Sequence, residues 1–203
     1  MPVTHAGSVR GKAFAEAASR LGLAPVVVTP AQAGQTPVEE NGPTVRTIFL
    51  YDSYAVHLPV PFPALLLPLT VSRLRGVAAR SAARVVVSST PGLFLSLESF
   101  LVAKLLQIPF FLDVRDAWKL EEKTHAGRLR NQIKSWLEGV VSRGATKVWT
   151  VTDSLARLVR QTHHLPLDRV AVVPNGADLT RFRPGTVEKR YDLVFLGTPA
   201  SYR

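Results

Sequence analysis

Short apolar runs alternate with longer mixed stretches along the chain, and this alternation predicts its secondary structure. Strands are expected at the apolar runs 26–29, 45–50, 84–89, 109–114, 147–151, 170–174 and 192–197. Several runs are continuously apolar, as is typical of parallel strands that are buried on both faces. Helices are expected at 8–22, 64–80, 92–107, 126–143 and 153–162, with Ser8 and Asp153 as N-caps and Gly22 as a C-cap. This order predicts an α/β fold with a Rossmann-like, doubly wound parallel sheet.

Polar and turn-forming residues follow the predicted strands. In open parallel sheets ligands bind outside the carboxyl ends of the strands, so we expect these residues to converge on one rim. They are Thr90, Arg115, Asp116, Asp153, Ser154, Asn175 and Gly176. The densest group follows the strand at 109–114, where Asp113, Arg115 and Asp116 lie close together. Two interpretations are open: Arg115 and Asp116 face a ligand cleft, or an internal ion pair closes the end of the strand.

The composition is that of a globular protein, since 46% of the 203 residues are hydrophobic and 20% are charged. The absence of cysteine excludes disulfides and cysteine metal sites, and it fits a reducing compartment. No secretory signal is expected, and no apolar run reaches the ~18–20 residues of a membrane-spanning helix. The adjacent His163 and His164 do not share a helix face, so no metal site is expected there. Trp136 and Trp149 are expected in or near the core.

The formal net charge is +10, from 25 Lys and Arg against 15 Asp and Glu. This excess predicts attraction to phosphate in a nucleic acid, a nucleotide or an anionic membrane surface. Only the charge supports a nucleic acid, because zinc-finger spacing and RNA-binding aromatic signatures are missing. An apolar stretch at 59–69 precedes four arginines: Arg73, Arg75, Arg80 and Arg84. This segment either dips into a membrane surface or forms a buried helix whose far face is solvated.

The segment 170–184, VAVVPNGADLTRFRP, resembles the linker of GT-B glycosyltransferases of family 4. The matching residues are Pro174, Asn175, Gly176, Asp178, Phe182 and Pro184. Upstream, the strand that ends in Asp-Val-Arg-Asp-x-Trp at 113–118 resembles one subgroup of that family. The segment 5–22 is similar to the family's glycine loop with its downstream arginine, here Gly7 and Arg10, and DLVFLG at 192–197 resembles the first strand of the second domain.

The resemblance implies the amino-terminal, acceptor-side domain of such an enzyme over 1–184, followed by a linker and the start of a carboxyl-terminal donor domain over 185–203. Family members transfer a sugar from a nucleotide sugar to an acceptor with retention of configuration, without a metal or other cofactor. The implied catalytic residues are Arg115 and Asp116. The implied donor-phosphate residues are Gly7, Ser8, Arg10, Gly197 and Arg203. The implied acceptor residues are Thr90, Asp153 and Ser154, and Asn175 and Gly176 are implied to shape the interdomain turn.

Several positions depart from the family pattern. A strand precedes the family's glycine loop, whereas only the six residues MPVTHA precede Gly7 here, and they are too few and too polar for that strand. Arg115 stands where many members have a histidine, and a guanidinium cannot act as a base. The donor domain is incomplete, so we expect no sugar transfer by these residues alone. The implied acceptor is a glycan or a lipid-linked saccharide, and the implied location is cytoplasmic, peripheral on the inner face of the cell membrane.

Other functions remain open on the sequence. A non-catalytic Rossmann-like module that binds a nucleotide or a partner is the main alternative. A sugar-nucleotide epimerase also has GT-B-like halves, but the segments 113–116 and 174–178 argue against it. A nucleic-acid binder would need a steep salt dependence of duplex binding.

Overall fold

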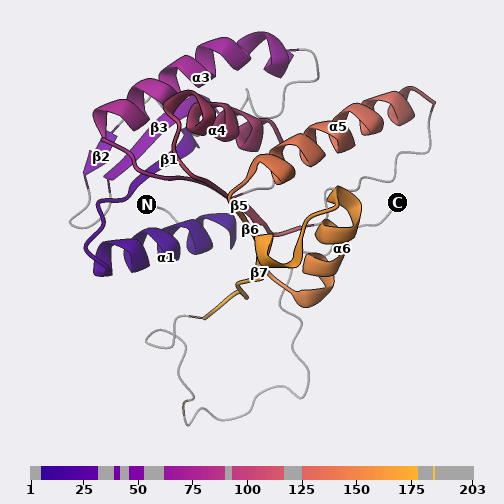
Figure 1. The fold of residues 1–203 in the computed structure, drawn as a ribbon. Helices are drawn as coiled ribbons and strands as arrows, with labels where there is room; N and C mark the ends of the chain where they lie inside the picture. The colour runs from indigo at the N-terminus through magenta and orange to yellow at the C-terminus, as the bar shows by residue number, and fades with distance from the viewer. Residues whose placement is uncertain are drawn as a thin grey trace.

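The computed structural model describes residues 6–31, 39–41, 46–52, 62–89, 93–116, 125–177 and 185. From α3 onward, helices alternate with parallel strands, which confirms the predicted α/β class (Figure 1). The expected strand at 192–197, and with it Gly197, lies outside the described residues, as do Thr90 and Arg203.

The order of elements follows the predicted alternation. The helices are α1 (Ala6–Arg20), α3 (Phe62–Arg80), α4 (Leu93–Leu106), α5 (His125–Gly144) and α6 (Asp153–His163), with a 3₁₀ turn η1 (Leu167–Arg169). The strands are β1 (Val26–Ala31), β2 (Glu39–Asn41), β3 (Arg46–Asp52), β4 (Val86–Ser89), β5 (Phe110–Val114), β6 (Lys147–Thr150) and β7 (Val170–Val172). Strand β2 and turn η1 were not predicted.

Hydrogen bonds group the described strands into two sheets. One sheet has the order β4-β5-β6-β7 and is parallel throughout. The other has the order β1-β3-β2, in which β1 and β3 are parallel and β2 is antiparallel. Because neighbours in the four-stranded sheet are consecutive in sequence, α4, α5 and α6 each connect adjacent strands. The carboxyl ends of β4 to β7 therefore lie along one edge, which is the rim that the sequence predicts.

The main core covers one face of the four-stranded sheet. Leu112 and Val148, which are register partners, are both fully buried, as is Val141 of α5. They belong to one cluster with Leu97, Phe100, Ala103, Phe110, Val114, Ala145, Leu155, Val159 and Leu165. Each fully buried Leu, Val or Phe stabilises the fold by roughly 1.5–3 kcal/mol, so this cluster fixes the helices on that face.

Aromatic side chains connect the opposite face to α1. The Phe111 and Trp149 rings stack with centroids 5.2 Å apart, and Phe14 of α1 meets Trp149 edge-on at 5.6 Å. Trp149 is half-buried, as expected. The expectation for Trp136 is wrong, because its side chain is 63% exposed on α5. Side chains alternate along a strand, so Asp113 points to the α1 side together with Phe111.

Four helices end in the same backbone motif. The residue in the left-handed region is Gly22 (φ 78°), Ala82 (φ 47°), Gln107 (φ 55°) or His164 (φ 53°). In each case the next N–H donates to the carbonyl five residues earlier, as from Leu23 to Ala18 at 3.1 Å, which is a Schellman ending. The prediction of Gly22 as a C-cap is therefore confirmed.

The predicted N-caps are wrong. Helix α1 begins at Ala6, so Ser8 lies inside its first turn. Helix α6 is capped by Thr152, whose backbone is extended and whose Oγ1 accepts a hydrogen bond from the Leu155 N–H at 3.2 Å. Asp153 is instead the first helical residue, where its negative charge interacts favourably with the helix dipole.

The same substitution is predicted to have opposite effects at two nearby exposed alanines. Ala82→Gly removes the side-chain penalty of the left-handed conformation and should raise the free energy of unfolding by about 1 kcal/mol. Ala79→Gly, inside α3, should lower it by about 1 kcal/mol. Urea unfolding of both variants measures the two changes in the free energy of unfolding. If both changes had the same sign, this account of the α3 ending would be contradicted.

A second prediction concerns pH. Burial raises the pKa of Glu138 from its ordinary value of 4.5 to about 7, partly opposed by the charge of Lys134. Between these values the unfolded chain releases the proton and the folded chain keeps it, so this group makes stability fall as pH rises. Because the side chain is only half-buried, the loss should be about 1–2 kcal/mol. Glu138→Gln should match the wild type at about pH 4 and exceed its unfolding free energy at about pH 8. A difference that is constant with pH would contradict the assignment.

Candidate functional site

A buried ion pair stands at the carboxyl end of β5. Arg10 and Asp113 are 9% and 0% exposed, respectively. The Arg10 Nη2 donates to Asp113 Oδ1 at 2.8 Å, and its Nε donates to Oδ2 at 3.0 Å. This two-bond geometry is the strong form of a guanidinium–carboxylate contact. The pair ties α1 to the middle of the four-stranded sheet.

Arg10 also holds the segment that leaves β7. Its Nη2 donates to the Val173 carbonyl at 2.9 Å, and its Nη1 donates to the Pro174 carbonyl at 3.1 Å and to Asn175 Oδ1 at 3.2 Å. The Phe14 ring lies 4.6 Å from the guanidinium carbon. We call Arg10, Asp113 and the 173–175 segment the arginine latch.

The latch bears on the expectation that Arg10 contacts the donor phosphate. A guanidinium has five N–H groups, and the bonds to Asp113, Val173, Pro174 and Asn175 engage all of them. A donor phosphate would have to replace one of these partners. Arg10 thus has a structural role in this arrangement, and its contact with a donor phosphate stays a prediction, as do those of Gly7 and Ser8 in the first turn of α1.

Strand β4 contributes a further partner to the latch. The Ser89 hydroxyl donates to Asp113 Oδ2 at 2.8 Å. The Asp113 carboxylate thus accepts hydrogen bonds from Arg10 of α1 and from Ser89 of the neighbouring strand β4. Four separate parts of the chain meet at this one side chain: α1, β4, β5 and, through Arg10, the segment after β7.

An internal ion pair closes the end of β5, which is one of the two interpretations that the sequence leaves open. Asp113 and Arg10 form the pair, and Ser89 supports it. The sequence contains one signal for Asp113: an acidic residue inside an otherwise apolar strand requires a buried cation or several donors.

The remaining predicted residues occupy the same edge of the sheet. Arg115 is half-buried and Asp116 is exposed, directly after β5. Asp153 and Ser154 are exposed in the first turn of α6, which follows β6. Asn175 and Gly176 are exposed after β7, and Asn175 is joined to the latch. The structure thus places these side chains along the predicted rim, and their roles stay predictions.

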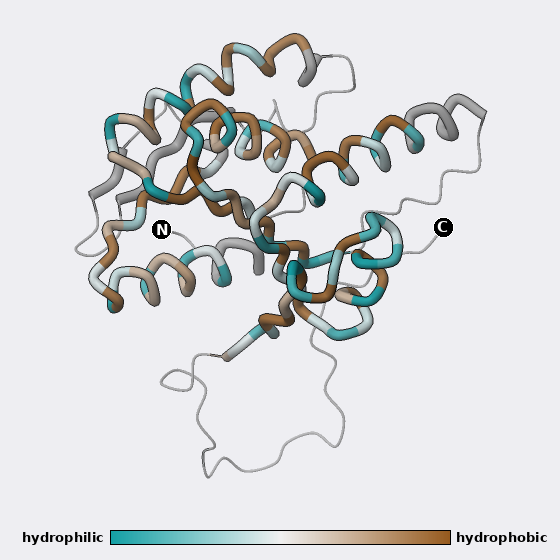
Figure 2. The backbone as a smooth tube through the Cα atoms, viewed as in Figure 1, coloured by the Kyte–Doolittle hydropathy of each residue, from teal (hydrophilic) through white to brown (hydrophobic). Residues whose placement is uncertain are grey.

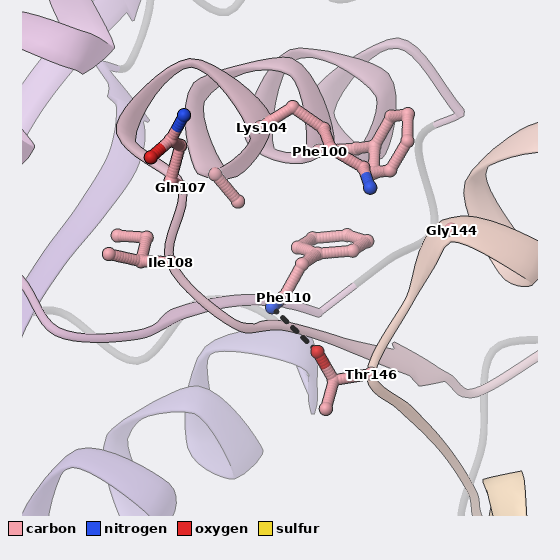
Figure 3. Close-up of a pocket in the computed structure, with 8 residues that line it drawn as sticks. Phe100, Lys104, Gln107, Ile108, Phe110, Gly144 and Thr146 are labelled. Carbon is pink, nitrogen blue, oxygen red and sulfur yellow. Dashed lines mark hydrogen bonds between the residues drawn. The ribbon is translucent and has the colours of Figure 1, made fainter.

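A cavity of about 330 Å³ lies at the opposite edge of the sheet (Figure 3). It is lined by Phe100, Ala103, Lys104, Gln107, Ile108, Phe110, Gly144 and Thr146. The Phe110 N–H donates to Thr146 Oγ1 at 3.2 Å beside it. Because Phe110 begins β5, this cavity is at the amino ends of the strands, where α/β folds do not usually bind substrates.

The described residues contain no group of three or more His, Asp or Glu side chains arranged to hold a metal ion. His163 is buried, and burial, followed by the charges of Arg143 and His164, lowers its pKa. Within the same ranges, each helix is too short or too polar to cross a bilayer.

A family model described as a glycosyl transferase 4-like domain matches residues 8–176. Two solved chains of sucrose-phosphate synthase from Thermosynechococcus elongatus are similar in fold. The first has a TM-score of 0.62 at 15% identity and covers 84% of this chain and 86% of that chain. The second has a TM-score of 0.67 at 16% identity and covers 89% of this chain but 45% of that chain. No curated protein matched the sequence.

The arginine latch predicts strong coupling between its two charged residues. Arg10→Met and Asp113→Leu should each lower the free energy of unfolding by about 3–5 kcal/mol, because each leaves a buried charge without its partner. The double variant should lose at least about 2 kcal/mol less than the sum of the single losses.

The exposed pair of Lys12 and Glu16, 3.6 Å apart on the same helix, is the matched control. Lys12→Met, Glu16→Gln and their double variant should give a coupling below about 0.5 kcal/mol. Urea unfolding measures both cycles. A coupling at Arg10 and Asp113 as small as in the control would show that the latch does not hold the fold together.

Proposed function

The chain belongs to the glycosyl transferase 4-like domain family, and on that premise we propose that it is the acceptor-side half of a retaining glycosyltransferase. Such an enzyme moves a hexose from a nucleotide sugar to a glycan or a lipid-linked saccharide. The donor half is a second domain, of which 185–203 is the beginning. Within the family we place the chain in the subgroup marked by Asp-Val-Arg-Asp-x-Trp.

The observation that supports this role is the position of the arginine latch. Arg10 holds the Val173 and Pro174 carbonyls at the carboxyl edge of the sheet, so the chain leaves the domain at the rim. A domain that begins there stands opposite the rim and forms a cleft over it. Ligands of open α/β sheets bind at this edge, so the cleft brings donor and acceptor together.

The rim residues have distinct proposed tasks. The N–H groups of the first turn of α1, near Gly7 and Ser8, donate to the donor diphosphate and add the positive end of the helix dipole. Arg115 stabilises the negative charge that develops on the diphosphate as the bond from its oxygen to the anomeric carbon breaks. Asp116 accepts a hydrogen bond from the acceptor hydroxyl and orients it toward the same carbon.

Thr90, Asp153 and Ser154 extend the proposed acceptor surface. Asp153 and Ser154 begin α6 beside the end of β6, and both are exposed. Their carboxylate and hydroxyl groups suit the hydroxyl groups of a saccharide. Asn175 and Gly176 shape the turn into the second domain. Gly197 and Arg203 are proposed to contact the diphosphate from the donor side.

The second candidate is a non-catalytic module that binds a nucleotide or a partner. The observation in its favour is that all five Arg10 N–H groups are already bonded. The rim then offers less positive charge to a diphosphate than the sequence predicts. Arg115 also cannot act as a base, unlike the histidine that many family members have at this position.

Saturation-transfer NMR of the chain with saccharides and with nucleotides tests the acceptor role. Saccharides should receive saturation, and Asp116→Asn should weaken their binding about tenfold, as expected for the loss of a hydrogen bond to a charged group. Asp168→Asn is the matched control, because η1 precedes β7 and lies at the opposite edge. Equal binding by the two variants would exclude the role of Asp116. Binding of nucleotides without saccharides would favour the non-catalytic module.

A further inference from the structure

Helix α3 exposes an unusual amount of apolar surface. The side chains of Leu65, Leu66 and Leu69 are 72%, 37% and 49% exposed. Leu67 turns the other way and packs against the core cluster, and Val71 is buried. The helix therefore already has a core-facing side, and the exposed leucines lie on the side that the described fold does not cover. Figure 2 shows the brown, hydrophobic colour of the amino-terminal turns of α3.

The same helix carries only positive charge. Arg73, Arg75 and Arg80 are exposed on it, and Arg84 follows it. The sequence has no Asp or Glu between Asp52 and Glu98, and Glu98 is buried. With 100° per residue, Leu65, Leu69, Arg73 and Arg80 fall on one side of the helix. We call these four residues the α3 docking face. It is apolar at its amino end and basic toward its carboxyl end.

The apolar end of this face lies at the carboxyl edge of the strands. Helix α3 leads into β4 through 81–85 and α4 leads into β5 through 107–109, so both helices end near the amino edge of the strands and begin toward the carboxyl edge. Thr70 Oγ1 of α3 donates to Glu98 Oε1 of α4 at 2.7 Å, which places the amino-terminal halves of the two helices side by side. Figure 1 shows α3 on the outside of α4.

We propose that the α3 docking face binds the surface of an anionic lipid bilayer. Leu65 and Leu69, with Leu66, enter the boundary between head groups and acyl chains, and the arginines pair with lipid phosphates. Leu65 and Leu69 are ~6 Å apart along the helix axis, about one turn, so both side chains reach the ~5–10 Å deep boundary that interfacial helices occupy. The helix enters obliquely, because its apolar and basic parts are separated along its axis.

The charge pattern favours a lipid surface over other occupants. A second copy of the chain would bring the same arginines against one another and raise the energy of contact. A nucleic acid would use the arginines but would leave the exposed leucines in water, since its grooves and phosphates are polar. An anionic bilayer satisfies both halves of the face. The inference does not depend on the proposed transfer reaction, because lipid binding needs neither donor nor acceptor.

Flotation with vesicles tests the proposal. The chain should float with phosphatidylcholine vesicles that contain phosphatidylglycerol and bind phosphatidylcholine alone far more weakly. Leu65→Ser with Leu69→Ser should reduce partitioning at least about tenfold. Arg73→Gln with Arg80→Gln should reduce it by about tenfold or more and lower its salt sensitivity.

Two further variants are matched controls. Leu21→Ser with Leu23→Ser changes leucines that are 80% and 59% exposed at the end of α1, and it should leave vesicle binding unchanged. Arg20→Gln with Arg157→Gln removes two exposed arginines that lie outside α3. This variant should change the logarithm of the vesicle partition coefficient by at most half as much as Arg73→Gln with Arg80→Gln. Circular dichroism verifies that each variant is folded.

A labelled residue gives an independent measurement. The chain has no cysteine, so Leu69→Cys accepts a single environment-sensitive dye, and Leu23→Cys is its control. The emission at residue 69 should shift to the blue on anionic vesicles, while that at residue 23 should not. The proposal is overturned if the wild type does not float, if both labels respond equally, or if the leucine variants instead abolish a dimer in solution.

Discussion

The buried carboxylate of Asp113 is the constraint on which the rest of the fold depends. It lies in the middle of a parallel sheet, 0% exposed, where an unpaired charge would cost several kcal/mol. Arg10 supplies the opposite charge and uses its remaining N–H groups for the carbonyls of 173 and 174. One side chain therefore fixes α1, β5 and the segment after β7 together. The packing of Phe14 on Trp149 follows from the same placement of α1.

The helices and strands that have a clear pattern of apolar residues could be predicted from the sequence. The five predicted helices and the six predicted strands that are described agree with the structure to within two residues at each end. Strand β2 was not predicted, because Glu-Glu-Asn has no apolar pattern and its pairing with β3 alone makes it a strand. The N-cap of α6 was misplaced by one residue, since Thr and Asp are both good caps and only the backbone angles distinguish them.

The candidate site could be predicted only in part. The edge at which Arg115, Asp116, Asp153 and Asn175 lie follows from the strand pattern and the rule for parallel sheets. The latch could not be predicted, because its two charged residues are 103 positions apart and no local signal pairs them. An arginine near the end of a strand suits both a phosphate contact and a buried ion pair. The sequence does not distinguish these two roles, because they differ only in the partners that surround Arg10 in the fold.

The distribution of positive charge connects these observations. The net charge of +10 predicts phosphate binding, yet Arg10 is paired with Asp113 and all its N–H groups are bonded. The uncompensated arginines of the described residues include those of α3, a helix without a single acidic residue. An electrostatic field that draws the chain toward anions therefore originates in part on α3, whose apolar end lies beside the rim. A lipid surface bound there would lie next to the edge where an acceptor is proposed to bind, so one arrangement would serve both capture at a membrane and access to a lipid-linked substrate.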